Sequence, residues 1–293
     1  MVDLELYRLF VTVANEGNIT KASEILHISQ PAISKQIHNL ESELNVTLFE
    51  RSNTGVKLTI DGNKLYFKIK DALSLIERVE EDFIENRTIH LGTRHSILSN
   101  IFSKGLSKFY NMYPNDMIDI KFLEIGEMLN QLNNGILDIV LTKRISDDAY
   151  DNLKFIKLGE LHSIFITKSE SKYTKKVFSL KELKNEIIYT NRKDSNAVCI
   201  QVLRNLFDTT DLKTFPNIKS VNTNAIVEIL KQDEALGFTT QEFVKEELDN
   251  KKIAIVNTDF DIPTSEYGIY YNKNNRFQAL DNLIECIKKE CKQ

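Results

Sequence analysis

The sequence predicts an α/β protein built from three consecutive parts: an all-α winged helix-turn-helix, a long linker helix, and a two-subdomain α/β domain. Three observations lead to this prediction. Short amphipathic helices and one hairpin pattern occupy residues 1–58, a single apolar stripe with helical spacing runs through 59–86, and strand and helix patterns alternate over 87–293. With 293 residues, of which 42% are hydrophobic, the chain can bury more than one core.

The composition argues against several classes of protein. The first residues lack a basic start followed by an apolar run, and no stretch approaches the roughly 18 uncharged apolar residues of a membrane-spanning helix. We therefore expect a cytoplasmic protein that is not bound to a membrane. The cysteines and histidines show neither disulfide nor metal-ligand spacing, so we expect no metal and no cofactor. They are the three cysteines, Cys199, Cys286 and Cys291, and four of the five histidines, His27, His90, His95 and His162.

The charge balance does not by itself indicate a nucleic-acid partner. The formal net charge is −4, and residues 1–60 hold five Lys and Arg against seven Asp and Glu. Because phosphate contacts dominate the affinity of DNA-binding proteins, a DNA-binding module with this composition must gather its positive charge on one face.

Two helices are predicted in the first part of the chain. In the first, apolar residues with helical spacing run from an Asp3 cap to Gly17, which ends the helix. The second begins at Thr20 and ends in a short turn. The apolar positions are Leu6, Phe10, Val13 and Ala14 in the first helix and Ala22, Ile25 and Leu26 in the second.

A third helix begins at Ser29, a good N-cap, and has Pro31 in its first turn, where the missing N–H costs nothing. Its apolar stripe steps by four, three and four residues, and the other faces are polar. Two short helices around a tight turn, the second with a polar N-terminal face, are typical of a helix-turn-helix. The stripe is Ile33, Ile37, Leu40 and Leu44, and the polar residues are Gln30, Ser34, Lys35 and His38.

A small hairpin, or wing, follows this helix. Strand patterns precede and follow Asn53-Thr54-Gly55, which supplies the turn. Arg51 and Lys57 flank the tip, where basic side chains can reach the phosphates beside a DNA groove.

Thr59 is predicted to cap a long helix whose apolar residues form a heptad seam, which passes through either Ala72 or Leu73. One interpretation is an amphipathic helix packed on its own domain. We favour dimerisation, because charged residues surround the seam as if no domain lay beneath it. The other seam residues are Leu65, Ile69, Ile76, Val79 and Phe83.

Residues 87–293 alternate between strands and helices, which predicts parallel sheets covered on both faces. Two similar sets split near Lys168 and rejoin near Pro263. We therefore expect subdomain I at 87–167 and 264–293 and subdomain II at 168–263. Gly135 and Asp138 belong to the turn that starts the predicted strand 137–142, and we expect both to have structural roles. Predicted strands are 89–91, 118–124, 137–142, 161–167, 187–190, 218–221, 235–239, 253–256 and 267–271; predicted helices are 97–113, 127–133, 198–207, 225–232, 241–248 and 277–289.

Ligands of open α/β sheets bind beyond the carboxyl ends of the strands, near helix N-termini. Here those positions carry hydroxyl groups and cations that suit a carboxylate or another small anion, although Lys143, Arg144 and Arg192 can equally be solvated loop residues. Cys199, which has apolar neighbours, is predicted to be a buried and unreactive thiol. The predicted effector site comprises Thr93, Arg94, Ser96, Gly126, Thr142, Thr190, Arg192, Thr223 and Thr239.

An ordered string of residues in the N-terminal part resembles the DNA-binding module of LysR-type transcription regulators. It runs through Ala22, Leu26, Ser29-Gln30-Pro31-Ala32, Ser34, Ile37, Leu40-Glu41, Leu44, Leu48-Phe49, Arg51, Leu58-Thr59 and Gly62. Weaker matches, such as LGTRHSI and GFTT, resemble the effector-binding domain of that family, which is similar to periplasmic solute-binding proteins. The resemblance implies that the linker helices of two subunits pair antiparallel, and that Ser96 and Thr142 lie at the effector site.

In this interpretation the helix-turn-helix residues divide into two groups by chemistry. Gln30 can form a bidentate contact with an adenine edge, and Pro31 can pack on a thymine methyl group. The other expected DNA contacts, mainly to phosphates, are Thr20, Ser29, Ser34, Lys35 and Arg51.

We therefore expect a sequence-specific transcription regulator controlled by a small, anionic effector, and not an enzyme, since no GxSxG, P-loop or GxGxxG motif is present. A solute-binding protein would carry a signal peptide, and an architectural DNA-binding protein would not need a sensing domain. The expected partners are double-stranded operator DNA, the effector, RNA polymerase, and further copies of the chain in a homodimer or homotetramer.

Overall fold

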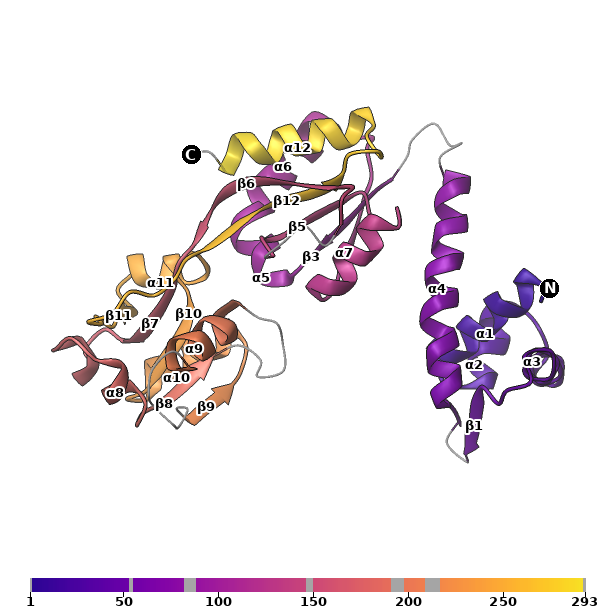
Figure 1. Ribbon diagram of the computed structural model, residues 1–293, viewed down its shortest axis with the longest axis horizontal. Coiled ribbons are helices and arrows are strands. Elements are labelled where there is room, and N and C mark those ends of the chain that lie inside the picture. Colours follow the sequence, from indigo (N-terminus) through magenta and orange to yellow (C-terminus); the bar gives the residue numbers. More distant parts are fainter. Residues whose placement is uncertain are drawn as a thin grey trace. The chain divides into compact units, whose positions relative to one another are not determined.

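The computed structural model (Figure 1) describes residues 2–52, 55–81, 88–145, 150–190, 198–208 and 217–291. The chain forms two compact units, Met1–Glu85 and Asn86–Gln293, and each unit has hydrophobic cores of its own. No helix in these described ranges is long and apolar enough to cross a membrane.

The first unit is the predicted winged helix-turn-helix, extended by one long helix. Its core contains Leu9, Phe10, Ala22, Ile33 and Leu40, none of which is more than 3% exposed. The apolar faces predicted for the first and third helices are thus confirmed. In the second helix Ala22 is buried and Leu26 packs against the core, but Ile25 is 56% exposed, contrary to the prediction. The elements are α1 (Leu4–Glu16), α2 (Ile19–Leu26), α3 (Gln30–Leu44), β1 (Phe49–Ser52), β2 (Gly55–Leu58) and α4 (Ile60–Glu81).

Capping groups set the ends of the first two helices. As predicted, Asp3 accepts a hydrogen bond from the Glu5 N–H at 3.1 Å, and Gly17 ends α1 with a left-handed φ of 59°. The second helix starts earlier than predicted, because the Asn18 side chain accepts hydrogen bonds from the N–H groups of Thr20 and Lys21. Thr20 therefore lies inside the first turn of α2.

The wing is an antiparallel hairpin that is held against the end of α1. Phe49 pairs with Leu58, and the Val56 N–H donates to the Gly17 carbonyl at 2.9 Å. A Cβ at Gly55, where φ is 138°, would lie 2.3 Å from the Gly17 carbonyl oxygen, so only glycine fits there. The predicted turn residues Asn53 and Thr54 lie outside the described residues.

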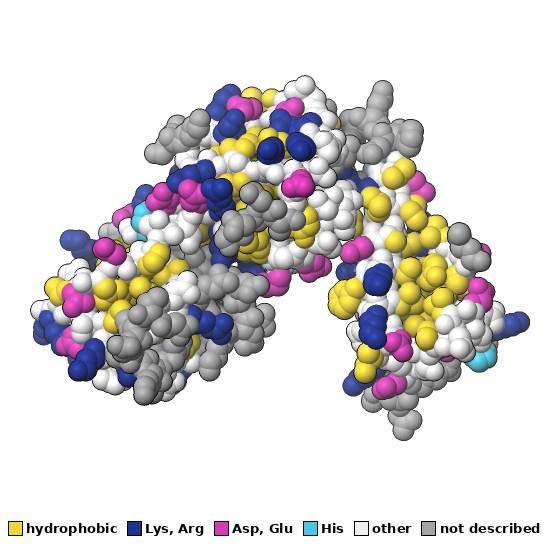
Figure 2. Space-filling model, viewed as in Figure 1, with side chains coloured by type: hydrophobic (Ala, Val, Ile, Leu, Met, Phe, Trp, Pro, Cys, Tyr) yellow, Lys and Arg dark blue, Asp and Glu magenta, His cyan; other side chains and the backbone are white. Residues whose placement is uncertain are grey.

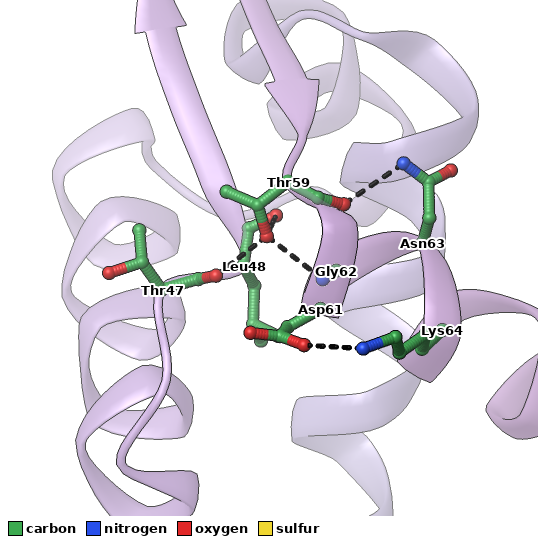
Figure 3. Close-up of polar contacts among 7 residues, drawn as sticks. All are labelled: Thr47, Leu48, Thr59, Asp61, Gly62, Asn63 and Lys64. Carbon is green, nitrogen blue, oxygen red and sulfur yellow. Dashed lines mark hydrogen bonds and ion pairs between the residues drawn. The ribbon is translucent and has the colours of Figure 1, made fainter.

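The start of α4 is joined tightly to the wing (Figure 3). Thr59 caps α4 as predicted: its Oγ1 accepts from the Gly62 N–H at 2.9 Å and donates to the Thr47 carbonyl at 2.7 Å. The Thr59 N–H donates to the Leu48 carbonyl at 3.0 Å. A Cβ at Gly62 would lie 2.1 Å from that same carbonyl oxygen, so the backbones approach closely only because Gly62 has no side chain.

The second unit contains two five-stranded sheets (Figure 1). The first has the order β4-β3-β5-β12-β6 and is covered by α6 and α12 on one face and by α7 on the other. Alternate residues of β5 show this: Ile139 and Leu141 pack in the α6–α12 cluster, and Val140 packs in the α7 cluster. Its elements are β3 (Ile89–Thr93), β4 (Ile118–Phe122), β5 (Ile139–Lys143), β6 (Leu153–Leu161), β12 (Ser265–Asn272), α5 (His95–Ile97), a π-helical segment η1 (Leu98–Phe102), α6 (Ser103–Met112), α7 (Ile125–Asn133) and α12 (Gln278–Cys291).

The second sheet has the order β11-β7-β10-β8-β9. Phe238 packs with Leu203 of α9 on one face, and Ile166 packs with Ile226 of α10 on the other. Its elements are β7 (Ser163–Lys168), β8 (Ile187–Thr190), β9 (Asn217–Ser220), β10 (Leu236–Thr240), β11 (Ile253–Ile255), η2 (Lys172–Thr174), α8 (Leu180–Leu183), α9 (Val198–Asp208), α10 (Thr223–Gln232), η3 (Gln241–Phe243) and α11 (Lys245–Asp249).

The prediction of parallel sheets is correct only in part, because each sheet is mixed. β3 pairs in parallel with β4 and β5, and β8 pairs in parallel with β9 and β10. β12 runs antiparallel to β5 and β6, and β7 runs antiparallel to β10 and β11. β7 and β12 are the strands that the chain forms directly after it has crossed from the other sheet. Each therefore enters its sheet from the end at which the strands that precede helices leave it. The predicted helix at 241–248 is a 3₁₀ turn and a short α-helix separated at Val244.

The chain crosses between the sheets at His162, not near Lys168 as predicted. The expected strand at 161–167 consists of the end of β6 and most of β7, which belong to different sheets. The long strand β6 was missed because it is a half-exposed edge strand that carries Lys154, Lys157 and Glu160. Sequence periodicity is weak in such a strand.

The structural roles predicted for Gly135 and Asp138 are confirmed. Gly135 has a φ of 80° after α7. The Asp138 side chain is fully buried and accepts hydrogen bonds from the His90 N–H at 2.8 Å and from Asn275 Nδ2 at 3.1 Å.

Candidate nucleic-acid interface and effector site

The N-terminal turns of α3 expose polar side chains on one face and bury apolar side chains on the other. Ile33 and Ile37 are buried in the core, whereas Gln30, Pro31 and Lys35 are exposed and Ser34 is half-buried. The stripe and the polar face lie on opposite sides because the stripe follows the helical period. This helix can therefore lie in a groove of DNA with its exposed polar side chains facing the bases.

The remaining predicted DNA contacts lie around the same helix. Ser29 is the N-cap of α3, but its side chain makes no capping hydrogen bond, so the exposed hydroxyl remains available to a phosphate. Thr20 is exposed in the first turn of α2. Lys57 is exposed on β2, while the side chain of Arg51, on β1, lies outside the described part of the chain.

Glu41 is a positioning residue that the sequence argument did not identify. Its Oε1 accepts hydrogen bonds from the Leu48 N–H at 2.7 Å and the Phe49 N–H at 3.2 Å. A side chain of α3 thereby holds the first strand of the wing. The only signal in the sequence was the Leu40-Glu41 pair within the family-like string.

The linker helix packs on α1 along one side only. The Tyr66 hydroxyl bonds the Asn15 side chain, and Glu77 lies 4.0 Å from Arg8 of α1. Leu73 is buried, at 7% exposure, and Ala72 is exposed, which places Ala72 rather than Leu73 on the uncovered side.

Apolar side chains remain on that uncovered side of α4. Ile69 and Ile76 are half-buried, Val79 is 53% exposed, and Leu75, which was not predicted, is 43% exposed. Leu65, which was predicted in the same seam, is half-buried and packs against the core of the first unit. Figure 2 shows hydrophobic side chains at the surface along α4, beside Lys and Arg side chains. Both sequence interpretations therefore describe part of this helix. Phe83 lies outside the described residues.

In the second unit, the carboxyl ends of the parallel strands of both sheets point toward the crossover between the sheets. β6 ends at Leu161 and continues through His162 into β7, whose Ser163 pairs with Thr240 at the end of β10. The return strand β12 begins at Ser265, opposite Leu161. Both connections thus join the same end of the first sheet to the same end of the second. The strand ends there carry Thr93 and Thr142 in the first sheet and Thr190 and Thr239 in the second.

Three hydroxyl groups at these edges are buried without a hydrogen-bond partner among the described residues. They belong to Thr142, Thr190 and Thr239, and all three residues are 0% exposed. Such groups are rare in folded proteins, because leaving a buried hydroxyl unpaired costs about 1–3 kcal/mol. All three were predicted as effector contacts. Unpaired donors at the edges of both sheets mark this region as a candidate ligand site.

The other predicted effector residues differ in which groups remain available to bind a ligand. The Thr93 hydroxyl donates to the Leu141 carbonyl at 2.9 Å, so it can offer a ligand only its oxygen as an acceptor. Ser96 is half-buried in the first helical turn after β3, and Gly126 is exposed at the start of α7, with open space where a Cβ would be. Thr223 is the first residue of α10, which Asn222 caps.

The predicted cations are largely engaged in ion pairs. Arg94 pairs with Glu124, the N-cap residue of α7. Arg144 pairs with Glu266 at 2.9 Å, and hydrogen bonds from Lys157 and then Arg144 lower the pKa of that carboxyl. Arg192 lies outside the described residues. Arg94 directly follows β3 and Arg144 directly follows β5, and each already has a carboxylate partner.

Among the described residues, neither a reactive thiol nor a set of metal ligands accounts for the site. Burial raises the pKa of Cys286, and it raises the pKa of Cys291 to about 11, so both stay protonated at neutral pH. The side chain of Cys199 lies outside the described residues, so its predicted burial stays a prediction. Within the part of the chain that the structure describes, no three His, Cys, Asp or Glu side chains could hold a metal ion together.

Two family models match nearly the whole chain. Residues 4–63 match the bacterial regulatory helix-turn-helix protein of the lysR family, and residues 85–292 match the LysR substrate binding domain. A probable RuBisCO transcriptional regulator of Phaeodactylum tricornutum is 28% identical and covers 98% of this chain and 97% of its own. A probable cat1 operon transcriptional activator of Acinetobacter lwoffii is 29% identical over 83% of this chain and 78% of its own.

Solved structures show the same fold. Full-length CbnR in complex with its target DNA is 16% identical and superposes with a TM-score of 0.73, covering 99% of this chain and 100% of that one. The matched relatives are transcription regulators, not enzymes.

Proposed function

Because this chain belongs to the LysR family of DNA-binding transcription regulators, we propose that its residues 1–58 bind double-stranded operator DNA through the N-terminal turns of α3. The observation that carries this proposal is the exposed Gln30, Pro31 and Lys35 on a helix whose other side is locked in the core. Gln30 contacts an adenine edge and Pro31 a thymine methyl group. Thr20, Ser29, Ser34, Lys35 and Arg51 bind the phosphate backbone.

The DNA proposal is tested by selecting bound genomic fragments with the full chain and footprinting the best site. Gln30→Ala should cost about 1–3 kcal/mol at one base pair and relax specificity there. Lys35→Ala, the comparison variant, should weaken binding to all sequences and flatten the salt dependence. An unchanged footprint and affinity for Gln30→Ala would refute base recognition by this residue.

We further propose that residues 87–293 bind a small anionic effector between the two sheets, with the chain crossing from one to the other at His162. The supporting observation is the set of unpaired hydroxyls of Thr142, Thr190 and Thr239, which lie at edges of both sheets. A ligand that bonds both edges favours the arrangement in which they are close together. RNA polymerase, in the cytoplasm, is the proposed recipient of the signal.

Arg94 supplies the charge in this proposal. Its side chain is 29% exposed and its partner Glu124 is 56% exposed, so an incoming carboxylate can replace Glu124 without removing a buried charge pair. The helix that follows Arg94 has no side-chain cap, which leaves N–H groups near Ser96 for the same carboxylate.

Calorimetry of the full chain against a panel of small carboxylic acids and their amides tests the effector proposal. An acid should bind, and its amide should bind at least tenfold more weakly. Ser96→Ala and Thr142→Val should abolish the transcriptional response with operator binding nearly intact. Equal binding of acid and amide would refute the anionic effector while leaving the regulator unaffected.

Finally, we propose that residues 59–86 form a homodimer through Leu65, Ile69, Ile76 and Val79, and that dimers assemble into tetramers. Ile69→Lys combined with Ile76→Lys places charges in an apolar interface and should dissociate the dimer. Sedimentation should then show monomers, and an unaltered dimer would exclude these residues from the interface.

A further inference from the structure

We infer that Phe243 couples the two halves of the effector site, because its side chain anchors the end of β10 in the core of the first sheet. The first half of the site is built on the first sheet and includes Ser96 and Thr142, and the second half is built on the second sheet and includes Thr239. Phe243 acts as a positioning residue, through Thr239 and not by contact with the ligand, and this role rests on the proposed effector site.

Phe243 and Val244 are consecutive in the chain but pack in different hydrophobic cores. Phe243 is half-buried against the first-sheet cluster that contains Phe102. Val244 is 1% exposed and packs with Ile166 and Ile226 in a cluster of the second sheet. The helical conformation is interrupted at Val244, where φ is −130° and ψ is 21°, so the two side chains can face separate cores. In a continuous α-helix they would point only about 100° apart.

The rest of η3 is bound to the residue at which the chain crosses between the sheets. The Gln241 N–H donates to the His162 carbonyl at 2.8 Å, and Glu242 Oε2 accepts from the His162 N–H at 3.1 Å. Glu242 Oε1 also lies 2.7 Å from His162 Nδ1. Although η3 directly follows β10 of the second sheet, it is therefore held at the crossover and in the core of the first sheet.

η3 also lies against η1, the π-helical segment of the first half. Each of these segments closely follows a proposed ligand contact in the chain: η1 begins two residues after Ser96, and η3 begins two residues after Thr239. π-helical turns are rare in proteins and are frequent at functional sites. A ligand that bonds Ser96 and Thr239 therefore acts on both sides of the contact between η1 and η3.

Close packing makes this contact a link between the two halves. A close-packed core resists partial displacement of a side chain, so a shift of the Thr239 edge either withdraws Phe243 from the first core or carries η1 with it. Withdrawal exposes apolar surface to water and is therefore the less favourable response. The Thr239 edge and η1 move together, and a ligand bound to one half changes the position of the other.

Hydrogen–deuterium exchange of the full chain without a ligand tests the contact. Phe243→Ala should speed exchange about fivefold or more in peptides from residues 98–112, which belong to the first half, as well as in peptides from 236–248. Phe243→Leu keeps an apolar side chain and should stay close to wild type at 98–112. If exchange at 98–112 is as slow in Phe243→Ala as in wild type, the inference is wrong.

Phe260→Ala is the matched control. Phe260 is also half-buried, but it packs with Phe165 in a cluster that belongs to the second sheet alone. Its truncation should speed exchange at residues 163–168 and leave 98–112 unchanged. Equal acceleration at 98–112 in Phe243→Ala and Phe260→Ala would show a general loss of stability and would contradict a specific role for Phe243.

A double-mutant cycle measures the coupling to ligand binding, with the carboxylic acid that binds most tightly in the calorimetric panel as the probe. Thr239→Val should weaken binding of this acid about tenfold in an otherwise wild-type chain, the loss expected for one hydrogen bond to a charged group. In the Phe243→Ala background the same substitution should weaken it less than about threefold, and in the Phe260→Ala background the full loss should remain. A tenfold loss in all three backgrounds would overturn the inference. If no acid binds to wild type, the proposed anionic effector fails, and the exchange experiment alone decides the role of Phe243.

Discussion

The unpaired hydroxyl of Thr142 leads to a prediction in which stability and function change in opposite directions. Valine has nearly the shape of threonine and suits a strand, so Thr142→Val replaces the hydroxyl with a methyl group and leaves the packing almost unchanged. Thr142 is fully buried on β5, and its hydroxyl has no partner among the described residues. The unliganded protein should therefore become more stable, by about 1–3 kcal/mol.

Thr93 on the neighbouring strand provides a matched control. It is also 0% exposed, but its hydroxyl donates to the Leu141 carbonyl at 2.9 Å. Thr93→Val removes this bond and leaves a buried carbonyl with one partner fewer, so it should lose about 1 kcal/mol. The two substitutions are chemically identical, so the opposite signs depend only on the hydrogen bond of the hydroxyl.

Hydrogen–deuterium exchange of the full chain measures both effects, because peptides from residues 88–143 report on the second unit alone. Exchange through unfolding of this unit should be roughly tenfold slower in Thr142→Val and roughly tenfold faster in Thr93→Val, since about 1.4 kcal/mol corresponds to a factor of ten. If Thr142→Val exchanges as fast as Thr93→Val, its hydroxyl has a partner, such as an ordered water, and does not await a ligand.

The joint around the wing and the ionisable groups lead to further predictions. Gly62→Ala should destabilise the first unit by about 2 kcal/mol despite the better helix propensity of alanine, because its Cβ would meet the Leu48 carbonyl. Gly126→Ala should be neutral or stabilising, because there is open space around Gly126. Hydrogen–deuterium exchange in the first and second units, respectively, measures the two effects. Glu41→Ala should lower operator affinity and speed exchange at Leu48 and Phe49, whereas exposed Glu43→Ala should do neither. Hydrogen bonds from Lys176 and Ser179 lower the pKa of Glu182 from 4.5 to about 2, so its contribution to stability is present above pH 4.5 and is lost as the pH falls through 2, which NMR titration of this carboxyl can follow. Alkylation of Cys286 and Cys291 at pH 7 should be slow in the native protein and fast after denaturation.

The local elements were predictable from the sequence because their causes are local. Helical spacing of apolar residues, the caps Asp3 and Thr59, and the end of α1 at Gly17 depend on neighbours within a few residues. The family-like string around Gln30 indicated DNA binding for the same reason, since the two helices and the wing are contiguous in the chain. The polar face of α3 then needed only the helical period.

Only the tertiary structure decided which groups in the second unit meet. The mixed sheets, and the crossing at His162, arise because β7 and β12 pair with strands distant in the sequence. The sequence placed both Thr93 and Thr142 among the effector contacts. In the fold the Thr93 hydroxyl donates to the Leu141 carbonyl of the adjacent strand, whereas the Thr142 hydroxyl has no partner among the described residues. Likewise, Arg94 was a free cation in the sequence and is a partner of Glu124 in the fold. Hydrogen bonds and ion pairs between distant residues depend on register and burial, and the pattern of side chains along the chain specifies neither.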